Sequence, residues 1–252
     1  MKRETRYVIV IATILTTVAI TFIYTRFFYI GPPDIISATF NPKKVNISLY
    51  WKNDKGELYN NIGALKTSLE QQHSKLIFAT NGGMYDKSYQ PIGLYIQNQE
   101  MIKPLNTNIL KPDKNDNPPN FYRKPNGVFY ITTINEAGIC ETSKFPEQLK
   151  IKYATQSGPM LVIDGKINTI FDSISKNYNI RNGVGIRPNN ELVFAISKNK
   201  VTFYALAKYF KDQGCTNALF LDGYVSKAFL PEKNLFQMDG ELGVLIGITE
   251  NK

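Results

Sequence analysis

Residues 218–226 contain the residue types that most clearly suggest chemistry. The apolar run of residues 218–221 leads directly into Asp222 and Gly223. This pattern predicts a buried strand that carries one carboxylate to its C-terminal end and then turns. A carboxylate buried there without a partner costs several kcal/mol, so it needs a partner or a function. Strand ends of this kind hold ligand sites in α/β proteins, although Asp-Gly is also a common turn.

A second stretch combines an amide with adjacent glycines. The apolar residues 76–80 lead into Asn81, Gly82 and Gly83, and Asp86 follows three residues later. Paired glycines let the backbone approach a ligand, and an asparagine side chain donates and accepts at once. The alternative is an ordinary glycine turn.

Two further stretches carry polar groups beside predicted strands. Ser157 and Gly158 precede an apolar run, where no turn requires them, so they are candidates for lining a pocket. Arg181 stands before two glycines at strand spacing, and a buried arginine usually binds a carboxylate or phosphate. A surface position for Arg181 is the alternative. By contrast, Asp164-Gly165 lies between two apolar arms, which is the pattern of a hairpin turn.

Composition limits the classes of function. The 252 residues are 43% hydrophobic and 20% charged, which suits one globular domain. The net charge of +9 is scattered and contains no basic run, so no nucleic-acid partner is expected. The single histidine, His73, lies at the end of a predicted helix, where a surface or capping role is expected. The sequence has no cluster of histidine and carboxylate ligands, so neither a metal nor a cofactor is predicted, with calcium bound through loop carboxylates as the alternative.

The N-terminus has the pattern of a membrane anchor. Residues 1–6 are basic, residues 7–25 carry no charge, and aromatic residues 27–29 follow. We therefore expect a signal-anchor helix over residues 7–30, a cytoplasmic flank over 1–6 and a domain outside the cytoplasm. A cleaved signal peptide is the alternative. In an exported domain Cys140 and Cys215 could pair, although their spacing does not require it.

The order of predicted elements indicates an α+β fold. Residues 31–44 are expected to form a spacer, and residues 45–252 a single domain. Hairpin signals outnumber strand–helix–strand units, which favours a mixed, hairpin-rich sheet with a few packed helices. The clearest helices are residues 62–72 and the segment that follows Thr202, a plausible N-cap.

Four stretches together resemble the phosphodiester glycosidase family, and their order and spacing match. They are residues 78–85 with 91–93, residues 156–161, residues 181–185 and residues 219–223. The family includes the lysosomal uncovering enzyme, an N-acetylglucosamine-1-phosphodiester α-N-acetylglucosaminidase, and many exported bacterial proteins. It often carries a glycine- or serine-rich run after its Leu-Asp-Gly. Here only Ser226 fits that run.

The resemblance implies hydrolysis of a sugar-1-phosphodiester in a cell-envelope or exopolysaccharide substrate. Asp222 would then act as base or nucleophile, with Asp86 as the second candidate carboxylate. Arg181 would hold the phosphate. The remaining candidates would bind sugar hydroxyls or phosphate oxygens; they are Asn81, Gly82, Gly83, Ser157, Gly158 and Ser226. A module that binds envelope glycans without turnover is the alternative, and a metal-dependent phosphodiesterase is disfavoured.

Overall fold

The computed structural model describes residues 10–21, 31–108, 119–221 and 225–250. The chain divides into two compact units, Met1–Pro32 and Pro33–Lys252. The first unit contains an exposed helix over residues 10–21. Among the described residues, no helix is both long enough and apolar enough to span a bilayer. The rest of the predicted anchor, residues 7–9 and 22–30, lies outside the described residues.

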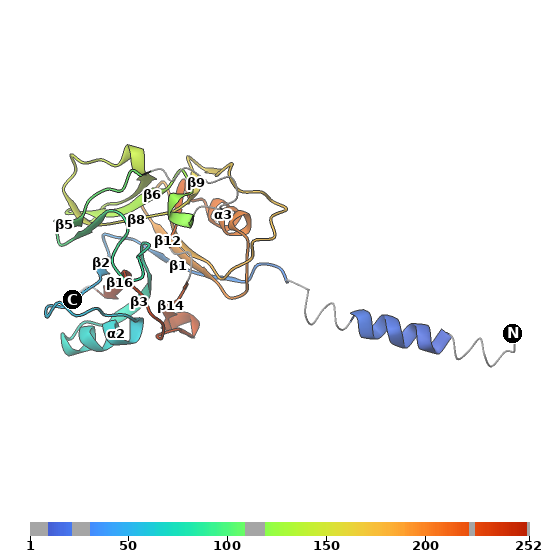
Figure 1. Ribbon diagram of the computed structural model, residues 1–252. Helices are drawn as coiled ribbons and strands as arrows, with labels where there is room; N and C mark the ends of the chain where they lie inside the picture. The colour runs from blue at the N-terminus through green and yellow to red at the C-terminus, as the bar shows by residue number, and fades with distance from the viewer. Residues whose placement is uncertain (1–9, 22–30, 109–118, 222–224, 251–252) are drawn as a thin grey trace, which may run out of the picture. The chain divides into compact units, whose positions relative to one another are not determined.

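The second unit contains three β-sheets (Figure 1). In spatial order, the six-stranded sheet consists of β1 (Ile35–Phe40), β12 (Leu192–Ser197), β11 (Asn182–Ile186), β13 (Asn217–Phe220), β9 (Met160–Ile163) and β10 (Lys166–Ile167). One five-stranded sheet consists of β15 (Leu235–Phe236), β14 (Ala228–Leu230), β3 (Leu76–Asn81), β16 (Leu245–Glu250) and β2 (Val45–Tyr50). The other consists of β5 (Glu100–Lys103), β4 (Tyr95–Gln97), β8 (Ile151–Ser157), β6 (Gly127–Thr132) and β7 (Ala137–Glu141).

The α+β class and the many hairpins are confirmed, whereas two details need correction. Every strand pairing in the described part of the chain is antiparallel, so the sheets are not mixed. The expected spacer of residues 31–44 is also shorter than predicted, because β1 pairs along its whole length with β12. Its alternating Ile-Ile-Ser-Ala-Thr-Phe sequence partly buries apolar side chains against the core.

One buried hydrophobic cluster draws residues from all three sheets. Phe78 of β3, Phe129 of β6 and Phe194 of β12 each come from a different sheet. The ring centroid of Phe194 lies 4.9 Å from that of Phe78 and 6.1 Å from that of Phe129. Aromatic contacts at these distances add to the stabilisation from apolar burial. The core therefore holds the ends of strands from different sheets in fixed relative positions.

Two α-helices cover the sheets. The Asn61 side chain caps α2 (Ile62–Gln71), which buries Ile62, Leu65 and Leu69 next to β3. The hydroxyl of Thr202 caps α3 (Phe203–Asp212) by accepting from the Ala205 N–H at 3.1 Å, as expected from the sequence. Figure 1 shows α3 beside β9. Three 3₁₀ turns complete the described elements: η1 (Asn120–Tyr122), η2 (Thr142–Lys144) and η3 (Pro231–Lys233).

Three smaller predictions concern single residues. Asp164 and Gly165 join β9 to β10 with φ values of 48° and 75°, which is the backbone that a two-residue hairpin requires. His73 lies just beyond α2 in an exposed position, as expected. Cys140 and Cys215 are both free thiols, so they form no disulfide with one another.

Candidate functional site

The predicted site stretches meet at one place, although they come from three different sheets. Asn81 ends β3, Ser157 ends β8, Asn182 begins β11, and Leu221 follows the last residue of β13. Hydrogen bonds join them: Asn182 Nδ2 donates to Asn81 Oδ1 at 3.0 Å, and Ser157 Oγ donates to the Leu221 carbonyl at 2.9 Å. Four sequence segments separated by up to 140 residues therefore share one polar centre.

A buried amide network forms the middle of this centre. Its members are the side chains of Thr80, Asn81, Asn182 and Ser226, together with the backbone of Lys227. The two amides donate to one another, and Asn182 Nδ2 also donates to Thr80 Oγ1 at 2.8 Å. Asn81 Oδ1 accepts from the Lys227 N–H at 2.9 Å, while Thr80 Oγ1 donates to the Lys227 carbonyl at 2.9 Å.

The network binds the chain on both sides of the predicted catalytic residue. Ser157 holds the Leu221 carbonyl, and Asn81 with Thr80 holds the backbone of Lys227. In the sequence Asp222 falls between Leu221 and Lys227, and residues 222–224 are outside the described residues. Through these bonds Ser157 and Asn81 hold the described backbone on the two sides of residues 222–224.

Ser226 belongs to the same network. Its hydroxyl is 3.2 Å from Asn182 Oδ1 and 3.3 Å from the Ile180 carbonyl, both of which are acceptors for its single proton. The side chain is half-buried. The hydroxyl therefore links the loop after Asp222 to the start of β11, beside Arg181.

Arg181 is buried, as predicted, but its partners are neutral. Only 1% of the side chain is exposed. Its Nε donates to the Val201 carbonyl at 3.0 Å, and Nη2 donates to the carbonyl and Oδ1 of Asn177, both at 3.1 Å. No described carboxylate forms an ion pair with it. Burial, followed by repulsion from Arg123, lowers the pKa of Arg181 to about 10.

The predicted second carboxylate has a local structural role. Asp86 is exposed, and its Oδ1 accepts from the backbone N–H groups of Ser88 at 2.8 Å and Gln90 at 3.0 Å. These bonds form an Asx turn in the loop after β3. Asp86 also borders an open polar pocket of about 550 Å³, together with Lys103, Asn106 and Tyr122.

The glycines of the predicted site are explained by packing against protein atoms. A Cβ on Gly83 would lie 2.0 Å from Thr155 Oγ1, and a Cβ on Gly158 would lie 2.5 Å from Asn126 Cβ. Gly82 would meet Val244 at 2.8 Å, and its N–H already donates to the Val244 carbonyl at 2.7 Å. These residues allow β3 and β8 to approach their neighbours, which is sufficient reason for glycine at each position.

The sequence alone did not identify Asn182, Thr80 or Arg123 as site residues. Asn182 occupies a fully buried position in a strand whose other residues are apolar or glycine, and that polar exception is a usable signal. Thr80 is likewise the polar neighbour of Asn81 at the end of a buried strand. Nothing in the sequence around Arg123 indicates its place beside Arg181.

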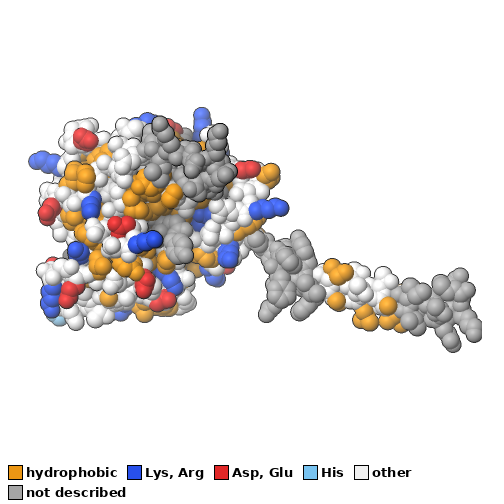
Figure 2. Space-filling model, in the orientation of Figure 1, with side chains coloured by type: hydrophobic (Ala, Val, Ile, Leu, Met, Phe, Trp, Pro, Cys, Tyr) orange, Lys and Arg blue, Asp and Glu red, His pale blue; other side chains and the backbone are white. Residues whose placement is uncertain are grey.

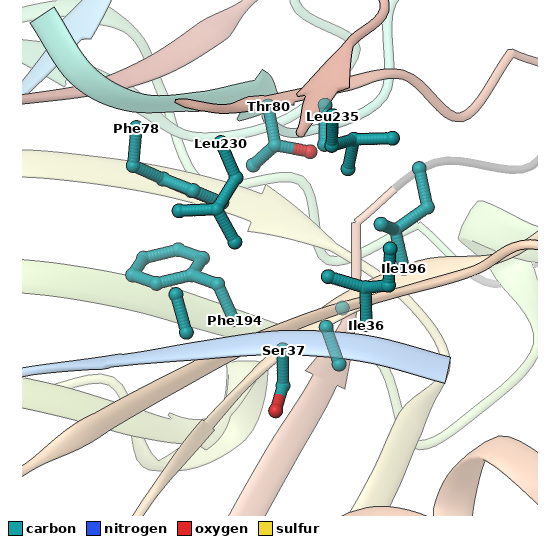
Figure 3. A pocket seen from close by; sticks show the side chains of 12 residues that line it. Ile36, Ser37, Phe78, Thr80, Phe194, Ile196, Leu230 and Leu235 are labelled. Atoms are coloured by element: carbon teal, nitrogen blue, oxygen red, sulfur yellow. The ribbon is translucent and has the colours of Figure 1, made fainter. Parts of the chain in front are cut away.

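A small cavity beside the network is a packing gap. Its volume is about 10 Å³, and its lining includes Thr80, Phe78, Phe194 and Leu230 (Figure 3). That volume is about that of one water position, and most of the lining is apolar. It is therefore too small to hold a sugar.

The fold is an α+β domain in which one polar centre joins strand ends from three sheets. A model of the phosphodiester glycosidase family matches residues 74–242, and the chain belongs to this family. The resemblance inferred from the four sequence stretches is thus confirmed. Among curated proteins, the uncharacterized protein YigE of Escherichia coli (strain K12) is 35% identical over 193 residues, which cover 76% of this chain and 72% of YigE.

Solved structures share the fold at low sequence identity. The catalytic domain of zebrafish N-acetylglucosamine-1-phosphodiester alpha-N-acetylglucosaminidase, auto-inhibited by its pro-peptide, has a TM-score of 0.59 and 14% identity. That similarity covers 88% of this chain and 86% of the zebrafish chain. A hypothetical protein from Synechocystis has a TM-score of 0.53 and 12% identity over 86% of this chain and 59% of its own. At these identities the similarity concerns the fold alone.

Proposed function

We propose that the chain hydrolyses the glycosyl–phosphate bond of a sugar-1-phosphodiester, with Asp222 as its catalytic carboxylate. The observation that carries this proposal is the attachment of the chain on both sides of residues 222–224. Ser157 holds Leu221 on one side, and Asn81 holds Lys227 on the other. Buried neutral side chains that hold the chain on both sides of a carboxylate support a preorganised catalytic residue.

The proposed reaction breaks the bond between C1 of the sugar and the bridging oxygen. Water supplies the new oxygen at C1, and the phosphate departs with the bridging oxygen. The products are a free sugar and a phosphomonoester. Phosphate is a weakly basic leaving group, so the main requirements are stabilisation of an oxocarbenium-like sugar and of negative charge on the phosphate. Asp222 serves the first requirement, and the buried guanidinium of Arg181 serves the second.

The proposal depends on Asp222 and does not require Asp86. The Asp86 carboxylate is exposed and already accepts two backbone hydrogen bonds within its turn. This makes Asp86→Asn a matched control for Asp222→Asn, because the amide oxygen of asparagine can keep both of those bonds.

The test is a screen of the full-length chain against sugar-1-phosphodiesters in ¹⁸O-labelled water. We expect the label in the released sugar, since the C1–oxygen bond breaks. Asp222→Asn should lower turnover by at least about 100-fold, the lower end of what a positioned acid–base group contributes. Asp86→Asn should stay near wild type. Label in the phosphate, or near-normal turnover by Asp222→Asn, would contradict the proposal. Binding of a phosphodiester without any product would favour the glycan-binding module.

We also propose that residues 7–30 anchor the protein in a membrane, with the domain on the periplasmic or extracellular face. The support is the uncharged run of residues 7–25 behind a basic flank, of which residues 10–21 are helical. Carbonate extraction and protease accessibility in intact cells test the anchor, and release into the soluble fraction would contradict it.

On the face shown in Figure 2, basic and acidic side chains are interspersed, in keeping with a carbohydrate rather than a nucleic-acid substrate.

A further inference from the structure

The three described arginines differ in how their charge is balanced. Arg187 forms an ion pair with Glu191, with 3.2 Å between Nη1 and Oε2. Arg123 and Arg181 form no ion pair with any described carboxylate. Uncompensated buried guanidinium groups are costly, and two close together repel each other. Their arrangement therefore calls for an explanation other than protein stability.

Both guanidinium groups lie over the same aromatic ring. The Cζ atom of Arg181 is 3.6 Å from the ring centroid of Phe203, and that of Arg123 is 5.7 Å from it. The ring itself is held firmly: Phe171 stacks on it with a centroid distance of 5.1 Å, and Phe220 contacts it edge-on at 4.8 Å. The two cations are thus placed by a rigid hydrophobic support.

The positive end of a helix adds to the same region. Phe203 is the first residue of α3, a helix of 10 residues that has no acidic residue in its first turn. Arg181 Nε bonds to the carbonyl of Val201, which directly precedes the N-cap Thr202. A helix N-terminus favours anions and disfavours cations. Two arginines at this place are electrostatically unfavourable unless negative charge balances them.

Arg181 is also preorganised to bind such an anion. Its Nε and Nη2 atoms are fixed by backbone and amide oxygens, whereas Nη1 has no hydrogen-bond partner among the described residues. Arg123 follows η1, and its side chain is half-buried, so it can reach the same region from a different segment.

We propose that Arg123 and Arg181, at the N-terminus of α3, form a two-armed subsite for a phosphate-type oxyanion. The assignment of that oxyanion to the phosphate of the substrate rests on the proposed function. Arg123 is the second arm of the subsite, and it contributes binding energy and specificity for phosphate over an uncharged group.

The test measures binding of inorganic phosphate to the full-length chain by calorimetry at constant ionic strength. Arg123→Gln should weaken phosphate binding about tenfold, the size expected for a charge-assisted hydrogen bond. Arg123→Lys, which keeps the charge without the fork, should give an intermediate affinity. Lys211→Gln on the exposed side of α3 removes the same charge elsewhere, and should stay within about twofold of wild type.

Three results would overturn the subsite: no phosphate binding by wild type, unchanged binding by Arg123→Gln, or an equal loss in Lys211→Gln. Circular dichroism and the unfolding temperature of each variant show whether its fold is retained. The outcome is separable from that of the proposed reaction. Arginine-dependent phosphate binding without sugar release would leave the subsite standing and reject the glycosidase. Sugar release by a protein whose phosphate binding does not depend on Arg123 would support the glycosidase and reject the subsite.

Discussion

The amide network and the arginine pair lie at the two sides of the start of β11, and they satisfy their polar groups in opposite ways. In the network, Asn182 and its partners are neutral, and protein atoms supply both donors and acceptors. In the pair, Arg181 keeps its charge in a buried position with neutral partners and a second guanidinium nearby. Neutral groups whose hydrogen bonds are satisfied fix geometry, whereas a charge without a carboxylate partner among the described residues is suited to binding a ligand.

The comparison shows that a buried polar residue can serve one of two purposes, to fix the structure or to bind a ligand. Asn81 and Arg181 both follow from the sequence as candidates for contact with the substrate. Their bonds differ: Asn81 accepts from the backbone N–H of Lys227, whereas Arg181 bonds only neutral partners among the described residues, and we propose that it binds an anion. Each region therefore predicts its own response to mutation, and the responses can be compared.

The largest effect is expected from Asn182→Leu, which tests the network. Removing the amide leaves the side chains of Thr80, Asn81 and Ser226 with fewer partners in a buried site. We expect the free energy of unfolding to fall by about 3 kcal/mol, measured by urea denaturation. Asn46→Leu, at an exposed position of β2, should change it by less than about 0.5 kcal/mol. Equal stability of the two variants would show that the network is not structural.

Arg181→Met tests the arginine pair, the second region of the comparison. In phosphate-free buffer it should cost less stability than Asn182→Leu, because the lost hydrogen bonds are offset by relief from a buried charge and from repulsion by Arg123. Phosphate at 100 times its Kd should stabilise wild type by about 2.7 kcal/mol. The variant should lose nearly all of this stabilisation, as measured by urea denaturation with and without phosphate. A variant that still gains stability from phosphate would exclude Arg181 from the subsite.

The pH dependence of phosphate binding sharpens the assignment to Arg181. Its pKa of about 10 means that the cation is present below that pH and is lost above it. Phosphate affinity should therefore hold to about pH 9 and fall about fourfold by pH 10.5. Arg123→Gln removes one cause of the lowered pKa, so the decline should move to higher pH. A decline that stays at the same pH in Arg123→Gln would mean that another group titrates.

Local features of this fold were predictable from the sequence. Thr202 caps α3 because its hydroxyl bonds within one turn, and Asp164-Gly165 forms a hairpin because both residues adopt positive φ. Strand β3 follows from its apolar run. Each of these depends on residues that are neighbours in the chain.

Features set by distant contacts were not predictable. The sequence gives no sign that β1 pairs with β12, nor that Arg123 lies over the ring of Phe203 beside Arg181. Two site stretches were found because Asn81 and Asp222 follow apolar runs, and the other two because Ser157 and Arg181 stand just before predicted strands. Their division into positioning and binding groups required the hydrogen bonds, because Asn81 and Arg181 look equally functional in a linear sequence.

The smallest effect is expected from Ser226→Ala, which tests whether Ser226 only belongs to the amide network or also contacts the substrate. Ser226 is half-buried and its hydrogen-bond distances are long, at 3.2 and 3.3 Å. If the hydroxyl only links the loop to β11, the variant should lose about 0.5 kcal/mol of unfolding free energy. Its turnover and phosphate affinity should then stay close to those of Ser88→Ala, an exposed control. A loss of turnover at unchanged stability would instead move Ser226 from the positioning group to the groups that contact the substrate.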